Sequence, residues 1–381
     1  MPSTTPGPLP FLSKMTLSIL LLVLIGGIIW VGQEIIVPFA FAILLSVLLL
    51  PFNNWMEKKR IPRVAAILIS LIISLVFIAG VIYFLATQIS NFVDDLPKIK
   101  QQLELHFRTL QKWVSQQFNL SRKEQTEMIE NATEKMKGSG TGVIGQTFTS
   151  ITHMLAVVVL LPVYSFLMLY YRDMIRKFLI EVFEDKHEPR VREVLAESRT
   201  IVQSYMVGLL IELAIVAAIN SAGFLIIGIK YAIFLGILAA ILNLIPYIGM
   251  LIASILCMLI TLTTTNDISD VIWTGVVLVL VQFVDNNILM PRIVSSKVKI
   301  NALISILGVL IGGGLAGVSG MFLSIPAIAI LKVIFDRVDH LKPWGLILGD
   351  DITKPQEGKI YKRIRSMSSK QAPKKTSVSA N

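Results

Sequence analysis

Long runs without a charged residue constrain the fold of this chain more than any other feature. The clearest run covers residues 64–93, and two others cover residues 15–33 and 35–56. A helix needs roughly 20 apolar residues to cross a bilayer, so each run predicts a membrane span. Because backbone polar groups must be satisfied internally in lipid, we expect an all-α polytopic membrane protein.

Composition supports this class and excludes others. The chain is 54% hydrophobic and only 16% charged, whereas about a quarter of the residues of a soluble domain are charged. The net charge of +10 comes from bases at the ends of apolar runs and in the tail, so we expect contacts with anionic lipid and none with nucleic acid. A single cysteine, Cys257, excludes an intrachain disulfide and a cysteine metal cluster.

The pattern predicts about eight membrane segments, two of them broken, and a small soluble insert. The first two apolar runs are expected to form a helical hairpin. The expected regions are an N-terminal cytoplasmic segment (1–14), the first transmembrane helices (15–93), a soluble helical insert (94–146), a transmembrane helix (147–171), cytoplasmic amphipathic helices (172–199), a C-terminal transmembrane core with broken helices (200–335) and a basic, largely disordered cytoplasmic tail (336–381).

Basic residues in the links predict the orientation. Lys and Arg gather in residues 57–63, 172–199 and 292–299 and in the tail, and such links lie on the cytoplasmic side. Both chain ends are then cytoplasmic, in a bacterial inner membrane. The insert at 94–146 is placed outside by parity alone.

Two apolar stretches are interrupted by glycine and proline. The first break contains Pro246, Tyr247 and Gly249, after Asn243. The second stretch contains Gly308, Gly312, Gly313, Gly314, Gly317, Gly320 and Pro326. A pair of such re-entrant or hairpin-like elements indicates the binding site of a transporter, because freed helix ends can bind ions and polar groups. Close packing through small residues is the alternative explanation.

Ionisable and amide side chains inside apolar segments are the candidate ligands. Glu212 and Asn220 interrupt one span, and Gln282, Asp285 and Asn286 form a polar cluster shortly before Pro291 and Arg292. A charge at membrane depth is costly and usually has a partner or a function. Asp285 and Glu212 are therefore candidate ligands for a coupling H⁺ or Na⁺. Alternatively, Asp285 pairs with Arg292 near the interface, and Glu212, Asn220 and Asn243 only join helices.

These residues also carry a family resemblance. Gln282-x-x-Asp285-Asn286, Pro291-Arg292 and a glycine-rich run ending in Ser324-Ile325-Pro326 resemble the AI-2E family, the autoinducer-2 exporters. The likeness covers most of the chain and includes the segment from Asn243 to Gly249. It implies export of a small polar metabolite, and some members are described as cation/proton antiporters. Asn301-Ala302 replaces a frequent His-Pro pair, and Met250 replaces a frequent proline, which bears on substrate identity.

Three functions follow as hypotheses: a metabolite exporter, a Na⁺(Li⁺)/H⁺ antiporter, or a membrane scaffold that transports nothing. An enzyme is not expected. Gly317-Val318-Ser319-Gly320 matches the motif around a rhomboid protease serine, but none of the four histidines is placed to act as its base. No cofactor is expected beyond a coupling ion. Glycine-rich faces and the amphipathic insert favour a homo-oligomer.

Overall fold

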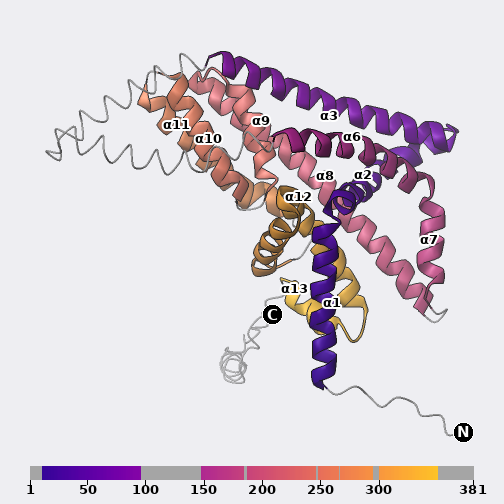
Figure 1. Cartoon of the computed structure of the whole chain (residues 1–381). Helices are drawn as coiled ribbons and strands as arrows, with labels where there is room; N and C mark the ends of the chain where they lie inside the picture. The colour runs from indigo at the N-terminus through magenta and orange to yellow at the C-terminus, as the bar shows by residue number, and fades with distance from the viewer. Residues whose placement is uncertain are drawn as a thin grey trace, which may run out of the picture.

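The computed structural model describes residues 11–95, 147–183, 187–245, 248–265, 267–294 and 300–350. Every regular element in these ranges is a helix, which confirms the predicted all-α fold (Figure 1). Most of the predicted insert and the tail beyond residue 350 lie outside the described residues.

The first three helices are α1 (Phe11–Val31), α2 (Gln33–Lys58) and α3 (Arg63–Asp94). The expected hairpin of the first two apolar runs is absent, because helical hydrogen bonding continues through Gly32. Its N–H donates to the Ile28 carbonyl at 2.8 Å, and its own carbonyl accepts from the Ile36 N–H at 2.9 Å. No residues are left to reverse the chain, so α2 leaves α1 at an angle (Figure 1).

Helices α2, α3 and α6 (Thr147–Tyr170) form one packed group. Ile67, Leu71 and Leu169 make its buried core, because apolar side chains from three helices meet there. Ion pairs tie its ends to α7 (Arg172–Glu181): Arg63 contacts Asp173 at 2.7 Å, and Arg172 contacts Glu57 at 2.6 Å.

Helix α8 (Glu188–Ile227) begins in the charged segment and continues without a break through the next apolar run. It packs against α9 (Ala232–Asn243) and α11 (Ile268–Val284), which continues as the π-helical segment η2 (Asp285–Val294). Helix α10 (Ile248–Thr264) packs against α9 and α11. The largest apolar core lies here, and it includes Phe224, Leu235, Ala253 and Leu278. This second group carries the polar residues predicted from sequence.

Helix α12 (Ala302–Arg337) is a hairpin, as the glycine-rich run predicts. The chain reverses at Ala316 and Gly317, and Gly317 has φ 57° and ψ −144°, a conformation that only glycine adopts readily. The arms touch through their backbones: a Cβ on Gly320 would lie 2.0 Å from the Gly312 carbonyl oxygen. Small residues therefore permit the close approach of the two arms.

Asn301 joins this hairpin to the short helix α13 (Lys342–Leu348). Its side-chain oxygen accepts from the Ile304 N–H at 2.9 Å and caps α12. Its amide nitrogen donates to the carbonyls of Ile347 at 2.5 Å and Gly349 at 3.0 Å. One side chain thus satisfies groups at two helix ends, which gives Asn301 a structural role.

We expect Asn301→Ala to lower the stability of the protein. Loss of an N-cap costs about 0.5–2 kcal/mol, and here the carbonyls at the end of α13 lose a donor as well. Asn301→Asp should keep the cap, but its second carboxylate oxygen would face the carbonyl oxygens of Ile347 and Gly349 and repel them. The midpoint of thermal unfolding of the purified protein should therefore fall in both variants. Equal midpoints for Asn301→Ala and the wild type would contradict this role of Asn301 in joining α12 and α13.

A set of ion pairs fastens the start of α8 to the end of α12. Arg337 contacts Glu197 at 2.7 Å and also pairs with Glu193, and Arg190 contacts Asp339 at 3.0 Å. Hydrogen bonds from Lys342 and Arg190 lower the pKa of Asp339 to about 2. This carboxylate therefore keeps its charge in moderately acidic solution, and its contribution is lost only as the pH falls toward that pKa.

The protein is a multi-pass membrane protein. Among the described residues, five helices are by length and composition long and apolar enough to cross a membrane: Gln33–Lys58, Arg63–Asp94, Glu188–Ile227, Ile268–Ile293 and Ala302–Arg337, the last of which bends back at Gly317 into two shorter arms. Large apolar side chains cover their outer faces, for example Val76 and Phe77 on α3, which are 66% and 65% exposed. Such surfaces require a lipid environment.

Candidate functional site

Two carboxylates lie inside the second helix group. Glu212 on α8 is 5% exposed, and Asp285, at the junction of α11 and η2, is 2% exposed. The two groups interact electrostatically with each other. Acidic residues are rare at membrane depth, and two in contact are a stronger indication of function than either alone.

Neither carboxylate is fully satisfied by the protein. The Asn243 amide on α9 donates to Asp285 Oδ2 at 3.0 Å. Asp285 Oδ1 and Glu212 Oε2 are buried and receive no hydrogen bond from any other group of the described chain, so only a proton shared between the two carboxyl groups satisfies them within the protein. A buried polar atom without a partner costs about 1–3 kcal/mol, and more if it is charged. A proton or a small cation held by these oxygens would remove that cost.

Two apolar layers enclose the carboxylates. On one side, Val216, Ala240 and Val281 pack together. On the other side lie Tyr205, Leu209, Leu244, Met290, Phe322 and Ile325. On each of the three elements the polar residue, Glu212, Asn243 or Asp285, falls between members of the two layers, and the chain order of the layers on α8 is opposite to that on α9 and α11. The polar site is therefore a layer of its own within an apolar bundle.

The position along the helices places the site at membrane depth. Asn243 ends a helix of 12 residues, and Asp285 follows one of 17 residues. With a rise of 1.5 Å per residue, these side chains lie about 17 Å and 26 Å from the helix starts. Both distances are shorter than the hydrocarbon layer, which is about 30 Å thick, so a helix that begins at the surface of this layer keeps each of these side chains within it.

The other predicted ligands lie apart from this pair. Gln282 and Asn286 face outward and bond to each other, with Gln282 Nε2 donating to Asn286 Oδ1 at 2.9 Å. Arg292 is exposed on η2 next to Pro291, and no ion pair joins it to Asp285 in the described chain. Asn220 is buried on α8, beyond the Val216 layer, with an unpartnered side-chain oxygen.

The broken elements adjoin the site from two sides. Pro246 and Tyr247 lie outside the described residues, but a Cβ on Gly249 would lie 1.7 Å from the Leu242 carbonyl oxygen, so α10 starts against the end of α9. From α12, Phe322 and Ile325 belong to the apolar layer that contains Tyr205 and Leu209. Pro326, the next residue in sequence, is also buried. Gly312, Gly313, Gly314, Gly317 and Gly320 lie in the arms and bend of the α12 hairpin.

Tyr205 lies near the site but was not among the residues predicted from sequence. This residue is 5% exposed and acts electrostatically on Glu212, two turns further along α8. Residues seven apart share a helix face, so the spacing of Tyr205 and Glu212 carried the signal. The π-helical geometry after Asp285 was also missed; such irregular turns occur often at functional sites.

The fold and the site together define a helical membrane protein with partly satisfied carboxylates enclosed in its core, an arrangement typical of secondary transporters. The chain belongs to the AI-2E transporter family, whose model matches residues 18–339. The protein is therefore a membrane transporter by family, as the sequence resemblance indicates.

Several relatives match over most of their length. YrrI of Bacillus subtilis (strain 168), whose name gives transport as a provisional assignment, is 26% identical over 311 residues, which cover 79% of this chain and 86% of YrrI. The AI-2 transport protein TqsA of Escherichia coli (strain K12) is 25% identical over 339 residues, which cover 88% of this chain and 94% of TqsA. These relatives are named for transport and not for catalysis.

Proposed function

We propose that this protein is a secondary transporter that exports a small polar metabolite of the autoinducer-2 type and couples export to H⁺ or Na⁺. Asp285 and Glu212 would hold the coupling ion, and the carbonyls and N–H groups freed at the breaks in α9–α10 and α12 would hold the substrate. We place the protein in the bacterial inner membrane, with both chain ends on the cytoplasmic side.

The buried carboxylate pair with two unpartnered oxygens supports ion coupling most directly. Two neighbouring carboxylates repel each other when both are ionised, so the pair has a high affinity for one positive charge. Asn243 holds Asp285 by one oxygen and leaves the other free. A proton or Na⁺ can therefore bind between the two helices that carry the acids and alter how they pack.

Similarity to TqsA supports the substrate class, because that relative is named as an AI-2 transport protein. At 25% identity the relative supports a class of solute and no single compound. The hairpin arms of α12 bring Gly317, with its exposed backbone, to the bend of a re-entrant element. Free backbone N–H and C=O groups at such a bend suit a small polar solute.

A second candidate function is exchange of Na⁺ or Li⁺ for H⁺ without an organic solute. The same observation favours it, since two neighbouring buried carboxylates suffice to bind either ion in turn. The two candidates differ in whether a solute crosses the membrane with the ion.

Proteoliposomes separate the candidates. Purified protein is reconstituted with imposed Na⁺ and pH gradients, and labelled autoinducer-2 and internal pH are followed together. Gradient-driven solute movement supports the exporter. Proton movement driven by Na⁺ without solute flux supports the antiporter. No movement of either would contradict both and favour a scaffold protein.

A further inference from the structure

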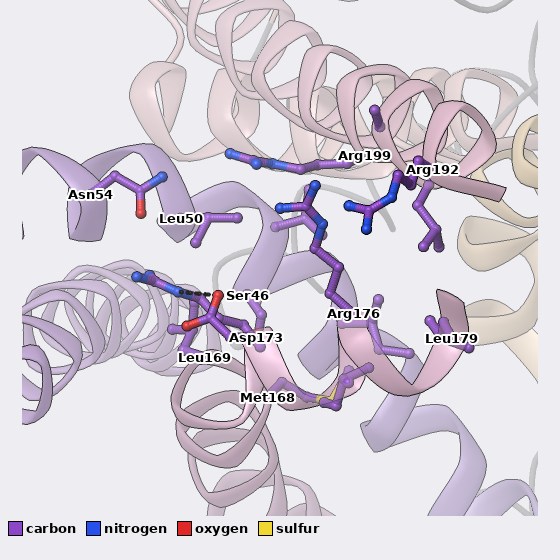
Figure 2. Close-up of a pocket in the computed structure, with 16 residues that line it drawn as sticks. Ser46, Leu50, Asn54, Met168, Leu169, Asp173, Arg176, Leu179, Arg192 and Arg199 are labelled. Atoms are coloured by element: carbon purple, nitrogen blue, oxygen red, sulfur yellow. Dashed lines mark ion pairs between the residues drawn. The ribbon is translucent and has the colours of Figure 1, made fainter. Parts of the chain in front are cut away.

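A cavity of about 460 Å³ opens away from the carboxylate pair, between α2, α6, α7 and α8. One wall is apolar and comes from Ile43, Val47, Leu50, Met168 and Leu169. The other wall, on α7 and α8, carries four arginines, whereas Asp173 is the acid among the lining residues. Figure 2 shows the side chains of Arg176 and Arg192 directed toward each other, and that of Arg199 extended over the opening toward the side of Asn54.

Ion pairs leave much of this positive charge uncompensated. Asp173 is engaged by Arg63 at 2.7 Å, and Arg192 by Glu188 at 2.6 Å. Arg176 and Arg199 form no ion pair in the part of the chain that the structure describes. Clustered guanidinium groups repel one another, so an anion between them lowers the free energy of the site.

Arg172 adds a second, independent indication of a ligand. Its Nη2 is held by Glu57 at 2.6 Å, but its Nη1 is buried and has no hydrogen-bond partner in the described chain. A buried guanidinium donor normally has an acceptor. An oxygen of a bound phosphate would supply it, because guanidinium groups match phosphate oxygens in geometry and charge.

The surroundings place this cavity at a membrane–water boundary. Tyr170 and Tyr171, at the junction of α6 and α7, pack edge to face and are 40% and 43% exposed, and Trp55 near the end of α2 is 51% exposed. Exposed Tyr and Trp gather at the headgroup level of membranes. From Asn54 the cavity runs about 16 Å along α2 to Ile43, which is into the apolar part of that helix.

We propose that this cavity binds an anionic phospholipid. The phosphate and headgroup contact Arg172, Arg176 and Arg199, and the glycerol region and upper acyl chain lie along the apolar wall of α2 and α6. The apolar wall distinguishes this ligand from a soluble phosphate, which would gain nothing from it. Such a lipid would join α7 and α8 to the α2–α6 group. Basic pockets between membrane helices bind lipid headgroups in this way.

The test titrates the purified full-length protein in detergent with dioleoylphosphatidylglycerol, dioleoylphosphatidylcholine or inorganic phosphate. Native mass spectrometry counts the bound lipid and gives the apparent Kd. We expect phosphatidylglycerol to bind with a fixed stoichiometry and phosphatidylcholine to bind at least about fivefold more weakly. Inorganic phosphate at the same concentrations should not displace phosphatidylglycerol. Equal binding of both lipids, or displacement by phosphate alone, would overturn the proposal.

Charge variants locate the site. Arg176→Gln and Arg199→Gln should each weaken the binding of phosphatidylglycerol about fivefold, since one basic residue at a membrane surface strengthens binding to anionic lipid by about that factor. Lys177→Gln and Arg190→Gln remove the same charge from the same helices outside this cavity, and should leave the Kd unchanged. An equal loss in the control variants would mean general surface attraction, which contradicts a built site. All four side chains are exposed or half-exposed, so folding should survive each change.

Discussion

Replacement of Asp285 by asparagine should reduce coupled transport about ten- to hundredfold while leaving the fold intact. Asparagine has nearly the same shape, and its side-chain oxygen can still accept the bond that Asn243 donates to Asp285 Oδ2 at 3.0 Å. What is lost is the negative charge and the second oxygen, which lacks a partner in the described chain. A charged hydrogen-bonding ligand contributes about 1.5–3 kcal/mol, which corresponds to a ten- to hundredfold loss of coupled flux.

Asp267→Asn is the matched control, because it removes the same charge from the same helix. Asp267 is exposed and caps α11 by accepting from the Ser269 N–H at 2.9 Å, and asparagine caps a helix equally well. Proteoliposomes of the control should transport at the wild-type rate. Equal flux in the Asp285 variant and the wild type would exclude this carboxylate as an ion ligand.

Glu212→Gln should produce a similar loss, and the double variant should lose little more than either single one. The reason is that both groups serve one bound ion, so their effects are not additive. Fully additive losses would indicate two separate sites. Flux measured under the same imposed gradient in all four proteins gives this comparison directly.

The fold class was predictable because it depends on local composition. Charge-free runs of spanning length specify helices in a membrane whatever their neighbours are. The bend in α12 was predictable for the same reason, since Gly317 and its neighbouring glycines announce it in the sequence. The helical connection at Gly32 was not predictable. Glu34 after the first apolar run suggested a turn, but hydrogen bonds through Gly32 keep the chain helical.

The site was predictable only in part, because its geometry is tertiary. Asp285 and Glu212 stood out as acids in apolar segments, but their contact depends on how α8 packs against α11. Gln282 and Asn286 share the polar cluster with Asp285, yet the helix turns them outward. Asn301 looked like a departure from the family pattern. Its hydrogen bonds to α13 could not be predicted, because that helix lies far along the chain.

The largest effect on stability is expected from Gly320→Ala. A Cβ at this position would lie 2.0 Å from the Gly312 carbonyl oxygen, and a backbone atom cannot move aside as a flexible side chain can. The two arms of α12 must then separate. Overpacking a tight contact typically costs about 1–3 kcal/mol, and the arms carry Phe322 and Ile325 in the layer below the carboxylates. We therefore expect a lower unfolding midpoint and reduced transport together.

Other glycines of the same hairpin provide a graded series. A Cβ on Gly314 meets nothing within 4 Å, so Gly314→Ala should be neutral or up to about 1 kcal/mol more stable, because alanine favours a helix. Gly313→Ala would meet the flexible end of Met321 at 2.7 Å and should fall between the two. Thermal unfolding of the three variants in one detergent tests this order. If Gly320→Ala proves as stable as Gly314→Ala, the arms are not held by backbone contact, and the glycines act by bending the chain alone.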